Sequence, residues 1–334
     1  MKASVGVVGG GSWGTALAQL LADNGQDVLF WMRHAEVAEE INRTRRNRRY
    51  LPEAELGAHV EATTDLARVG SECRVILMVV PSHGLRAVAR ELGDHLDGGH
   101  VLIHGVKGIE PGTFKRMTEI LREETCCRKI GVLSGPNLAK EVALKQPSAA
   151  VIASRFDEVV QTGRDLLWSS SFRVYGSSDV VGVEIAGAIK NVMAIAAGLA
   201  EGLGFGMNTM ALLVTRGLAE IARLGVAEGA RLETFQGLAG IGDLMATCFS
   251  PLSRNHRVGE HLAAGQTLDQ IVRSMDQVAE GVKTTRTVHE MAGELGVYMP
   301  ITEGVHRILF ESVPPREVLA SLMDITRYVY EFAP

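Results

Sequence analysis

One lysine stands inside an apolar, helix-forming stretch, and its surroundings suit it to proton transfer. The stretch reads VVGVEIAGAIKNVMAIAAGLAEG, residues 180–202, and its interior polar positions are Glu184, Lys190 and Asn191. Polar groups in such surroundings need partners. Burial disfavours the charged form of a lysine and lowers its pKa toward the range useful for acid–base chemistry. A lysine that snorkels to solvent or pairs with a carboxylate would give the same pattern.

A second stretch carries groups that suit an anion. GLAGIGDLMATCFSPLSRNHRVGEHL, residues 237–262, places Asp243 after a glycine-rich turn and Ser253, Arg254 and Asn255 before a segment with helical periodicity. An arginine offers a forked, charged donor, and the N–H groups at a helix start supply further donors for a phosphate or a polyol phosphate. A serine or asparagine helix cap with a surface arginine would produce the same sequence.

A glycine-rich turn lies in the N-terminal stretch SVGVVGGGSWGTALAQLLADNG, residues 4–25. Gly9, Gly11 and Gly14 fit the pattern G-x-G-x-x-G. In this pattern the missing side chains allow a tight turn, let a pyrophosphate reach the backbone and bring a helix close to a strand. Because a β-branched run precedes the glycines and a helical pattern follows them, we predict a dinucleotide site here rather than a plain turn.

The residues after the second predicted strand are basic. NAD-preferring sites of this kind carry an acidic side chain about twenty residues after the glycines, but VLFWMRHAE places Arg33 and His34 there. A guanidinium can bind a 2′-phosphate or stack on adenine, so the pattern favours NADP without excluding NAD. A solvated arginine at a helix start is the alternative. The basic run RTRRNRRYLPE, residues 43–53, is interpreted mainly as a solvated loop.

The elements that would position these groups follow from the hydrophobic pattern. After residue 178 the pattern of short strands gives way to helical periodicity. We therefore predict an α/β fold, with a Rossmann-type, mostly parallel doubly wound sheet over residues 1–178 and an all-α domain over residues 179–334. Ligands of such sheets bind beyond the carboxyl ends of the strands. In the first half, short apolar runs alternate with helical segments at residues 27–32, 75–80, 101–104, 130–133 and 149–153.

The composition is that of a soluble globular protein. The chain has 334 residues, 46% of them hydrophobic, and a formal net charge of −5. It is long enough for a large core, and its charge argues against binding to nucleic acid or an anionic membrane. No apolar run spans a bilayer without a glycine or a charge, so we predict a cytoplasmic protein without an integral membrane segment. Reduced thiols and no metal site are predicted from the spacing of Cys73, Cys126, Cys127 and Cys248.

Eight motifs, in the same order along the chain, carry a resemblance to a known family. They are GGGSWGTALA, RYLP, VKGIEPGT, SGPNLAKEVA, EIAGAIKNVMAIAAG, TRGLAEIARLG, GIGDLMATC and SPLSRNHRVGE. The chain resembles the bacterial NAD(P)-dependent glycerol-3-phosphate dehydrogenases over nearly its whole length. The resemblance implies a homodimer that reduces dihydroxyacetone phosphate to sn-glycerol 3-phosphate, a phospholipid precursor, with hydride from NADPH or NADH.

The resemblance also implies roles for individual residues. Lys190 would accept the proton when sn-glycerol 3-phosphate is oxidised and donate it in the reductive direction. Asn137 stands where the family usually has a serine or threonine. Besides the three glycines of the turn, the implied cofactor residues are Ser12, Trp13, Arg33, His34, Tyr50, Lys107, Ala139, Arg254, Val278 and Glu280. The implied substrate residues are Lys107, Gly135, Asn137, Lys190, Asp243, Ser253, Arg254 and Asn255.

Two other functions fit parts of the same pattern. Dehydrogenases of the 3-hydroxyacid or 6-phosphogluconate type share the two-domain plan and use a lysine on a helix of the second domain. The serine–arginine–asparagine triplet and the context KNVMAIAAG argue against them. A non-catalytic dinucleotide sensor would keep the first domain without the chemistry. The joint presence of Lys107, Lys190 and Asp243 argues against a sensor.

Overall fold

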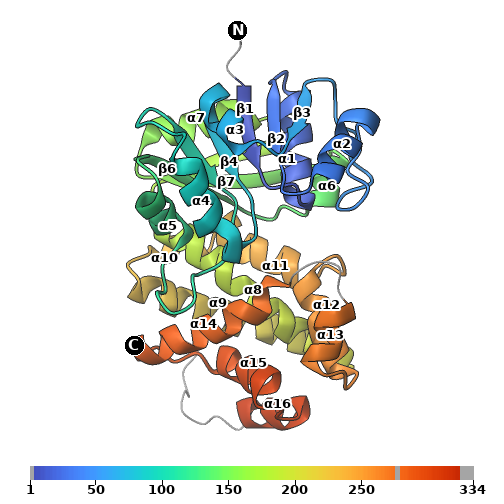
Figure 1. The fold of residues 1–334 in the computed structure, drawn as a ribbon. Helices are drawn as coiled ribbons and strands as arrows, with labels where there is room; N and C mark the ends of the chain where they lie inside the picture. The colour runs from blue at the N-terminus through green and yellow to red at the C-terminus, as the bar shows by residue number, and fades with distance from the viewer. Residues whose placement is uncertain (1–3, 275–278, 324–334) are drawn as a thin grey trace.

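The computed structural model describes residues 4–274 and 279–323. Figure 1 shows a sheet domain, built from the first half of the chain, stacked on a helical domain built from the second half. The predicted fold class is confirmed, because a mostly parallel sheet with helices precedes an all-helical region.

Within the described residues, eight strands form one sheet in the order β3-β2-β1-β4-β5-β6-β7-β8. Neighbouring strands are parallel except β6 and β7, which are antiparallel. The strands are β1 (Ser4–Val8), β2 (Val28–Trp31), β3 (Val60–Thr63), β4 (Cys73–Met78), β5 (Val101–His104), β6 (Lys129–Ser134), β7 (Ser148–Ser154) and β8 (Phe172–Ser177).

The apolar runs predicted as strands correspond to β2, β4, β5, β6 and β7. The β-branched run before the glycines is β1, so two strands, β3 and β8, are not predicted, and they are the edges of the sheet. Along both edge strands, buried side chains alternate with more exposed ones. Such alternation is typical of a strand that is covered on one face only, and it leaves no continuous apolar run in the sequence.

Helices cover both faces of the sheet, and the β1 strand lies where the chain connections diverge. From β1 the chain winds outward through β2 to β3, and then returns to β4 on the other side of β1. The reversal places the carboxyl ends of β1 and β4 side by side, and sheets of this kind bind ligands at such a point. The helices of this domain are α1 (Ser12–Asp23), α2 (Ala35–Thr44), α3 (Leu66–Glu72), η1 (Ser82–Gly84), α4 (Leu85–Gly93), α5 (Met117–Glu124), α6 (Ala139–Ala143) and α7 (Asp157–Leu167).

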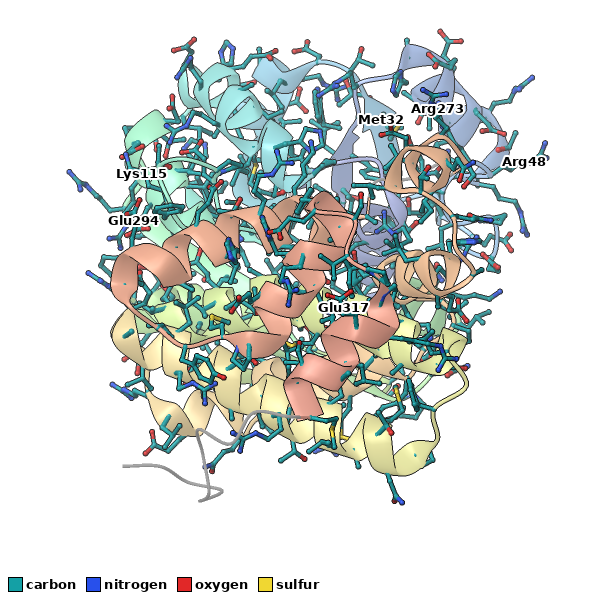
Figure 2. All side chains as sticks on the ribbon, turned by 90° about the horizontal axis from the view of Figure 1, so that it is seen from below. Met32, Arg48, Lys115, Arg273, Glu294 and Glu317 are labelled. Atoms are coloured by element: carbon teal, nitrogen blue, oxygen red, sulfur yellow. The ribbon has the colours of Figure 1, made fainter. Side chains whose placement is uncertain are left out.

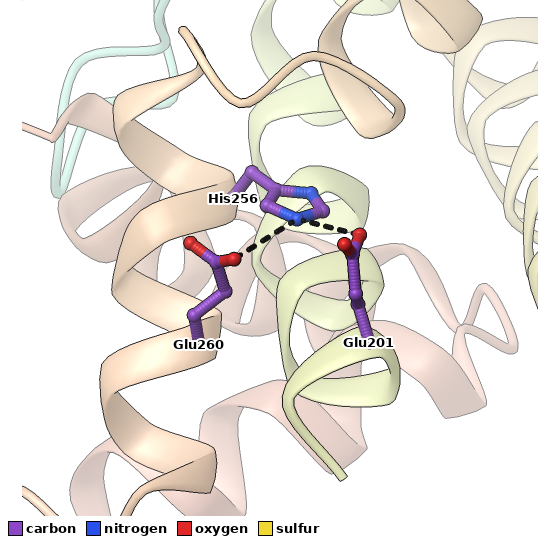
Figure 3. A group of neighbouring side chains, drawn as sticks. All are labelled: Glu201, His256 and Glu260. Carbon is purple, nitrogen blue, oxygen red and sulfur yellow. Dashed lines mark ion pairs between the residues drawn. The ribbon is translucent and has the colours of Figure 1, made fainter. Parts of the chain in front are cut away.

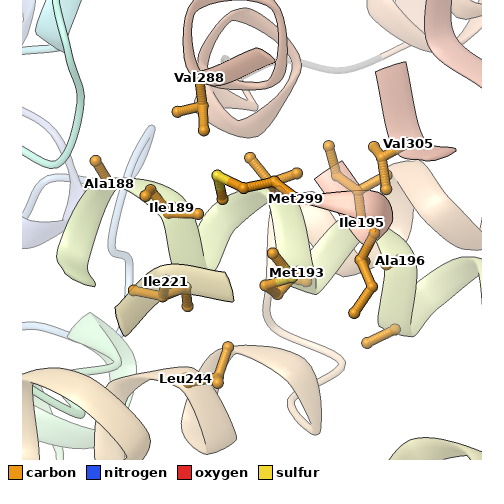
Figure 4. Packing of buried hydrophobic residues seen from close by; sticks show 14 of the residues in the cluster. Ala188, Ile189, Met193, Ile195, Ala196, Ile221, Leu244, Val288, Met299 and Val305 are labelled. Carbon is orange, nitrogen blue, oxygen red and sulfur yellow. The ribbon is translucent and has the colours of Figure 1, made fainter. Parts of the chain in front are cut away.

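The helical domain is built around one long apolar helix, α8 (Val180–Gly202). By length and composition α8 could cross a membrane, but 94% of its most apolar 18-residue window is buried in the fold. Figure 4 shows its side chains enclosed by those of neighbouring helices. The surrounding helices are α9 (Met207–Ala227), α10 (Leu232–Phe235), the π-helical turn η2 (Leu238–Gly242), α11 (Asp243–Cys248), α12 (Arg254–Ala263), α13 (Leu268–Ser274), α14 (Glu280–Leu295), α15 (Pro300–Phe310) and α16 (Pro315–Met323).

A buried carboxylate ties α9 to the start of α15. Glu220 is 1% exposed and accepts hydrogen bonds from the backbone N–H groups of Ile301 (2.7 Å) and Thr302 (3.2 Å). These groups belong to the first turn of α15, which has no partners for them within the helix. Burial raises the pKa of Glu220 to about 7, and the hydrogen bonds oppose this shift without cancelling it.

We expect Glu220→Gln to flatten the pH dependence of the unfolding free energy. Because the folded-state pKa of about 7 exceeds the ordinary value of 4.5, the contribution of this group is complete below that ordinary value and is lost as the pH rises through the folded value. The shift corresponds to on the order of 3 kcal/mol. Urea unfolding at about pH 5 and about pH 8 measures it. The same slope in wild type and variant would contradict the assignment, and Glu290→Gln, at an exposed position of α14, is the control.

Candidate active site

The glycine-rich turn between β1 and α1 leaves room for a ligand at a helix start. Gly9 has φ +131°, and a Cβ there would lie 2.7 Å from the carbonyl carbon of Val79. A Cβ on Gly14 would lie 1.9 Å from the carbonyl oxygen of Gly9, so α1 packs directly on the turn. Gly11 is the N-cap of α1 and faces open space. The N–H groups of the first turn of α1 can therefore bind a pyrophosphate.

The segment after α2 holds this turn in place. Asn47 is buried and donates from Nδ2 to the carbonyl oxygen of Gly10 (2.9 Å) and to Thr15 Oγ1 (2.8 Å). Ser12 Oγ donates to the carbonyl oxygen of Tyr50 at 2.6 Å, which brings two predicted cofactor residues together. The sequence does not predict the role of Asn47, because an asparagine inside an arginine run carries no sign of buried partners.

The arginine run around Asn47 lies mostly at the surface. Arg43, Arg48 and Arg49 are exposed, and Figure 2 shows Arg48 pointing away from the molecule. Arg45 is half-buried and donates from Nη1 to a backbone carbonyl oxygen of β3 at 2.8 Å. The interpretation as a solvated loop therefore holds for the exposed arginines, whereas Arg45 fastens the loop to the edge of the sheet.

Four further predicted cofactor residues lie at the carboxyl edge of the sheet or against it. Arg33 and His34 follow β2 and are exposed. Ala139 is the first residue of α6, which follows β6. Trp13 is half-buried, and a Cβ on Gly105, just after β5, would lie 2.9 Å from its Nε1. These positions surround the end of the sheet at which the glycine turn lies.

Two lysines and one aspartate meet between the sheet domain and α8. Lys190 Nζ donates to Asp243 Oδ1 at 2.5 Å and to Thr247 Oγ1 at 2.6 Å, and Lys107 Nζ donates to Asp243 Oδ2 at 2.5 Å. Lys190 and Asp243 are 6% and 2% exposed. Lys190 is therefore an ion-paired lysine, as one alternative proposed, and its partner belongs to the predicted substrate residues. The sequence does not predict that Thr247 contacts Lys190.

Burial and the neighbouring charges together bring the pKa of Lys190 down toward neutral pH. Burial lowers the pKa of Lys190 to about 8; the charge of Asp243 raises it and that of Lys107 lowers it further. Burial alone would raise the pKa of Asp243, but the two lysines hold it below its ordinary value. An ammonium group has three N–H donors. Asp243 and Thr247 accept two of them, so one remains for a ligand.

Polar atoms without partners lie close to Lys107. Ser134 Oγ and Asn137 Oδ1 are buried and have no hydrogen-bond partner among the described residues. A Cβ on Gly187 would lie 3.1 Å from Ser134 Oγ and 3.6 Å from Lys107 Cγ, so α8 packs directly against the Lys107 side chain. Gly135, at φ +136°, presents its carbonyl oxygen 3.4 Å from Lys107 Nζ. Since buried polar atoms are normally satisfied, a small polar ligand would complete this corner of the site.

The start of α12 combines a helix cap with a charged donor. Ser253 is the N-cap residue, and its Oγ accepts a hydrogen bond from the backbone N–H of His256 at 3.3 Å. Arg254 is the first residue of the helix and is exposed. The triplet can therefore be a helix cap and an anion site at once, because Ser253 caps α12 and the Arg254 side chain stays accessible at the start of this helix.

Asn255 joins three helices. Its Nδ2 donates to Asn191 Oδ1 on α8 at 3.0 Å, and its Oδ1 accepts from the backbone N–H of Gly281 on α14 at 2.9 Å. Both asparagines are buried. A Cβ on Gly281 would lie 2.7 Å from Asn255 Oδ1. Asn255 therefore positions the starts of α12 and α14 relative to the helix that carries Lys190.

Backbone contact fixes α12 against α8. A Cβ on Gly198 would lie 1.8 Å from the carbonyl oxygen of His256, and a Cβ on Gly259 would lie 2.1 Å from that of Ile195. No side chain fits at either position, so the two helices pack without intervening Cβ atoms. Because α12 is fixed against α8 in this way, the position of Arg254 relative to the lysine–aspartate cluster is also fixed.

A buried histidine reinforces the same helix contact. His256 Nε2 lies 3.1 Å from Glu201 Oε2 and 3.9 Å from Glu260 Oε1 (Figure 3). One histidine and two carboxylates could form a metal-binding set, but within the part of the chain that the structure describes His256 Nδ1 is buried without a hydrogen-bond partner. A metal on Nε2 would force the ring hydrogen onto that unpartnered Nδ1, and metal-binding histidines normally donate this hydrogen. The geometry therefore favours a hydrogen bond from Nε2 to Glu201.

The first residue of α14 connects the helical domain to the sheet domain. Glu280 Oε1 accepts a hydrogen bond from the backbone N–H of Ser82 in η1 at 2.9 Å. Burial raises the pKa of Glu280, whereas the Ser82 hydrogen bond and the charge of Arg254 lower it. Glu280 thus lies between the loop after β4 and the predicted phosphate donor Arg254. Val278, another predicted cofactor residue, lies outside the described residues.

Glu184, the other polar residue noted in α8, meets the sheet domain. Its carboxylate accepts hydrogen bonds from the Thr118 backbone N–H (2.8 Å), Thr118 Oγ1 (2.7 Å) and Arg116 Nη1 (3.0 Å). His104 Nε2 lies 3.2 Å from it at the end of β5. These partners fix the rotation of α8 against the sheet, and therefore the direction in which Lys190 points. The sequence indicates that Glu184 needs partners but not which residues supply them.

Comparison with known proteins identifies the family. The models for the N-terminal and C-terminal domains of NAD-dependent glycerol-3-phosphate dehydrogenase match residues 4–160 and 179–320. The chain is 47% identical over 320 residues to the glycerol-3-phosphate dehydrogenase [NAD(P)+] of Anaeromyxobacter sp. strain K, covering 95% of this chain and 96% of that protein. It is 45% identical over 325 residues to the protein of that name from Halothermothrix orenii, covering 97% and 95%.

A solved structure agrees in fold as well as in sequence. The crystal structure of glycerol-3-phosphate dehydrogenase from Coxiella burnetii superposes with a TM-score of 0.93 at 36% identity, covering 97% of this chain and 99% of that chain. The resemblance predicted from the eight motifs is thereby confirmed. The chain belongs to the family of NAD-dependent glycerol-3-phosphate dehydrogenases.

Proposed function

We propose that this protein reduces dihydroxyacetone phosphate to sn-glycerol 3-phosphate with NADPH or NADH and catalyses the reverse oxidation. The observation that carries the proposal is the buried cluster of Lys190, Asp243 and Lys107, which presents an N–H donor of a lysine with a lowered pKa. A general acid for a carbonyl group needs a pKa near the working pH. The product is a backbone precursor of phospholipids, which places the reaction in phospholipid metabolism.

The residues of the glycine turn fit a dinucleotide. The open face at Gly11 and the tight contact of Gly14 with Gly9 give a backbone cradle that side chains would fill. When bound, the dinucleotide supplies the hydride in reduction and accepts it in oxidation. Ser12, Trp13 and Tyr50 lie at this turn, and Glu280 contacts the loop after β4 from the helical domain. These residues would hold the two halves of the cofactor.

In reduction, Lys190 Nζ donates a proton to the carbonyl oxygen of the substrate as the new C–H bond forms, and Lys190 becomes neutral. Asp243 orients the ammonium group, because its Oδ1 and Thr247 Oγ1 hold two of the three N–H bonds. Lys107 adds a second positive charge beside the developing alkoxide, where charged donors stabilise a transition state. In oxidation, neutral Lys190 accepts the hydroxyl proton.

A direct assay tests the proposal. Oxidation of NADPH and NADH is followed by absorbance with dihydroxyacetone phosphate and, as a control, with unphosphorylated dihydroxyacetone. We expect turnover that requires the phosphate group. No turnover with either cofactor, while both still bind, would favour a dinucleotide sensor. Turnover only with a 3-hydroxyacid or 6-phosphogluconate substrate would favour one of the other two-domain dehydrogenases.

Arg254 is proposed to bind the substrate phosphate, since it is an accessible guanidinium at the first turn of α12. We expect Arg254→Ala to raise the KM for dihydroxyacetone phosphate, because loss of a charged hydrogen bond costs about 1.5–3 kcal/mol. Arg257→Ala, at an exposed position of the same helix, is the matched control. Steady-state kinetics measure the KM for dihydroxyacetone phosphate in both variants. An unchanged KM in Arg254→Ala would show that this arginine does not bind the phosphate.

The oligomeric state and the cellular location of the protein are inferred from its resemblance to the family. We infer a homodimer in the cytoplasm, with no nucleic-acid partner. Light scattering of the purified protein measures the mass of the particle in solution, and a monomer at working concentration would contradict the dimer.

A further inference from the structure

Three basic side chains lie around η1, the turn that follows β4. His83 lies in η1 itself. Arg33, from the end of β2, extends toward the same turn, because a Cβ on Gly84 would lie 4.0 Å from its Nη2. Lys283 lies on α14, one helical turn after Glu280, whose Oε1 accepts the backbone N–H of Ser82 at 2.9 Å. Arg33 and His83 therefore come from the sheet domain and Lys283 from the helical domain.

These side chains interact electrostatically, and a carboxylate close to them is that of Glu280, whose burial-raised pKa the charge of Lys283 lowers without a direct ion pair. Within residues 4–274 and 279–323, no ion pair or side-chain hydrogen bond involves Arg33, His83 or Lys283. Burial lowers the pKa of His83, and the positive charges of Lys283 and Arg33 lower it further. All three side chains are exposed, so a ligand can reach them. Two positive charges beside an imidazole that can donate a hydrogen bond favour the binding of an anion.

The position of the group indicates which anion it would take. In dinucleotide-binding sheets the adenosine ribose lies at the end of the second strand, where NAD-specific sites place an acidic side chain on the 2′-hydroxyl. Here Arg33 occupies that place. A 2′-phosphate carries up to two negative charges and accepts hydrogen bonds from several donors at once, which suits a guanidinium, an imidazole and an ammonium group.

We propose that Lys283 and His83 complete, together with Arg33, the binding site for the 2′-phosphate of NADPH, so that the helical domain takes part in selecting this cofactor over NADH. This inference rests on the proposed function for the identity of the cofactor. It assigns Lys283 a role in specificity: the 2′-phosphate bridges the two domains through this residue, whereas NADH leaves it without a partner.

Binding measurements test the proposal without relying on turnover. The dissociation constants of NADPH and NADH are measured by calorimetry for the wild-type protein and for Lys283→Gln, His83→Gln and Arg33→Gln. Loss of one charged hydrogen bond corresponds to about a tenfold or larger weakening. We therefore expect Lys283→Gln to weaken NADPH binding about tenfold while the affinity for NADH changes less than about twofold. Adenosine 2′,5′-bisphosphate and adenosine 5′-monophosphate should reproduce this difference as fragments.

A matched control separates local contact from net charge. Arg173→Gln removes one exposed positive charge on β8, at the opposite edge of the sheet from β3 and β2. It should leave both affinities unchanged. An unaltered NADPH affinity in Lys283→Gln, or equal losses for NADPH and NADH, would overturn the inference while leaving the proposed function intact. Failure of the wild-type protein to bind either dinucleotide would instead overturn the proposed function, and this inference with it.

Discussion

Replacing Lys190 by alanine is expected to lower kcat in both directions by about a thousandfold, within the range for loss of a general acid or base. The affinity for NADPH should stay nearly unchanged, because the Lys190 ammonium is buried against Asp243 and Thr247 rather than against the glycine turn. The folded state should persist, since Asp243 retains its contact with Lys107. Rapid-mixing kinetics and equilibrium binding of NADPH, each measured on the same preparation, separate the two effects.

The same lysine gives the reaction a pH dependence with opposite sign in its two directions. The pKa of Lys190 is lowered to about 8 by burial. Reduction requires the protonated amine, so its rate should fall as the pH rises through this value. Oxidation requires the neutral amine, so its rate should rise over the same interval. Both limbs should be absent from the residual activity of Lys190→Ala.

Controls make this result specific. Lys190→Met keeps much of the side-chain volume, so a comparable loss of kcat in both variants points to the amine rather than to a cavity. Lys129→Ala removes a partly exposed lysine of β6 that is paired with Glu158, and it should leave kcat unchanged. Near-normal turnover in Lys190→Ala would exclude Lys190 from proton transfer.

The parts of the fold that the sequence predicts are those in which one local pattern decides the structure. The central strands read as apolar runs because both faces of the sheet are covered. β3 and β8 are not predicted by this pattern, because their exposed positions carry polar side chains such as Glu61 and Arg173. An edge strand is defined by which strand it pairs with, and this is a tertiary property.

The site follows the same division. Lys190 and the glycine turn stand out locally, because a lysine in an apolar helix and three spaced glycines each need a special environment. The hydrogen-bond partners of Lys190 do not stand out in the sequence. Asp243 and Thr247 lie more than fifty residues away along the chain and contact Lys190 only because α11 packs on α8. Asn47 and the partners of Glu184 are likewise ordinary residues whose roles arise from long-range contacts. Close backbone packing between Gly198 and α12 carries no sequence signal beyond an isolated glycine.

Asp243→Asn is expected to have the second large effect, and it acts on stability as well as on activity. Asp243 is the carboxylate that both Lys107 and Lys190 contact, at 2.5 Å each. Removing its charge leaves two ammonium groups facing each other with one of them buried. Breaking a buried ion pair by removing one partner typically costs about 3–5 kcal/mol. We expect a loss of that order in the unfolding free energy at neutral pH, measured by urea denaturation.

The pH dependence of this loss identifies its cause. Without the carboxylate, the pKa of Lys190 should fall further, because the charge of Asp243 is what raises it. A lysine whose folded-state pKa is depressed disfavours the folded state while it is charged, so the variant should regain stability as the pH rises through the folded value toward the ordinary one. Its reductive kcat should fall at neutral pH, because less of the amine is protonated.

Asp94→Asn, at an exposed position after α4, is the control for a change in surface charge and should alter neither quantity. A variant Asp243→Asn whose unfolding free energy and kcat both match those of the wild type would show that the two lysines do not depend on this carboxylate. A variant that loses stability equally at all pH values would instead attribute the effect to packing. Only a loss that shrinks with rising pH, accompanied by a lower reductive kcat, supports the assignment of Asp243 as the group that keeps Lys190 protonated for catalysis.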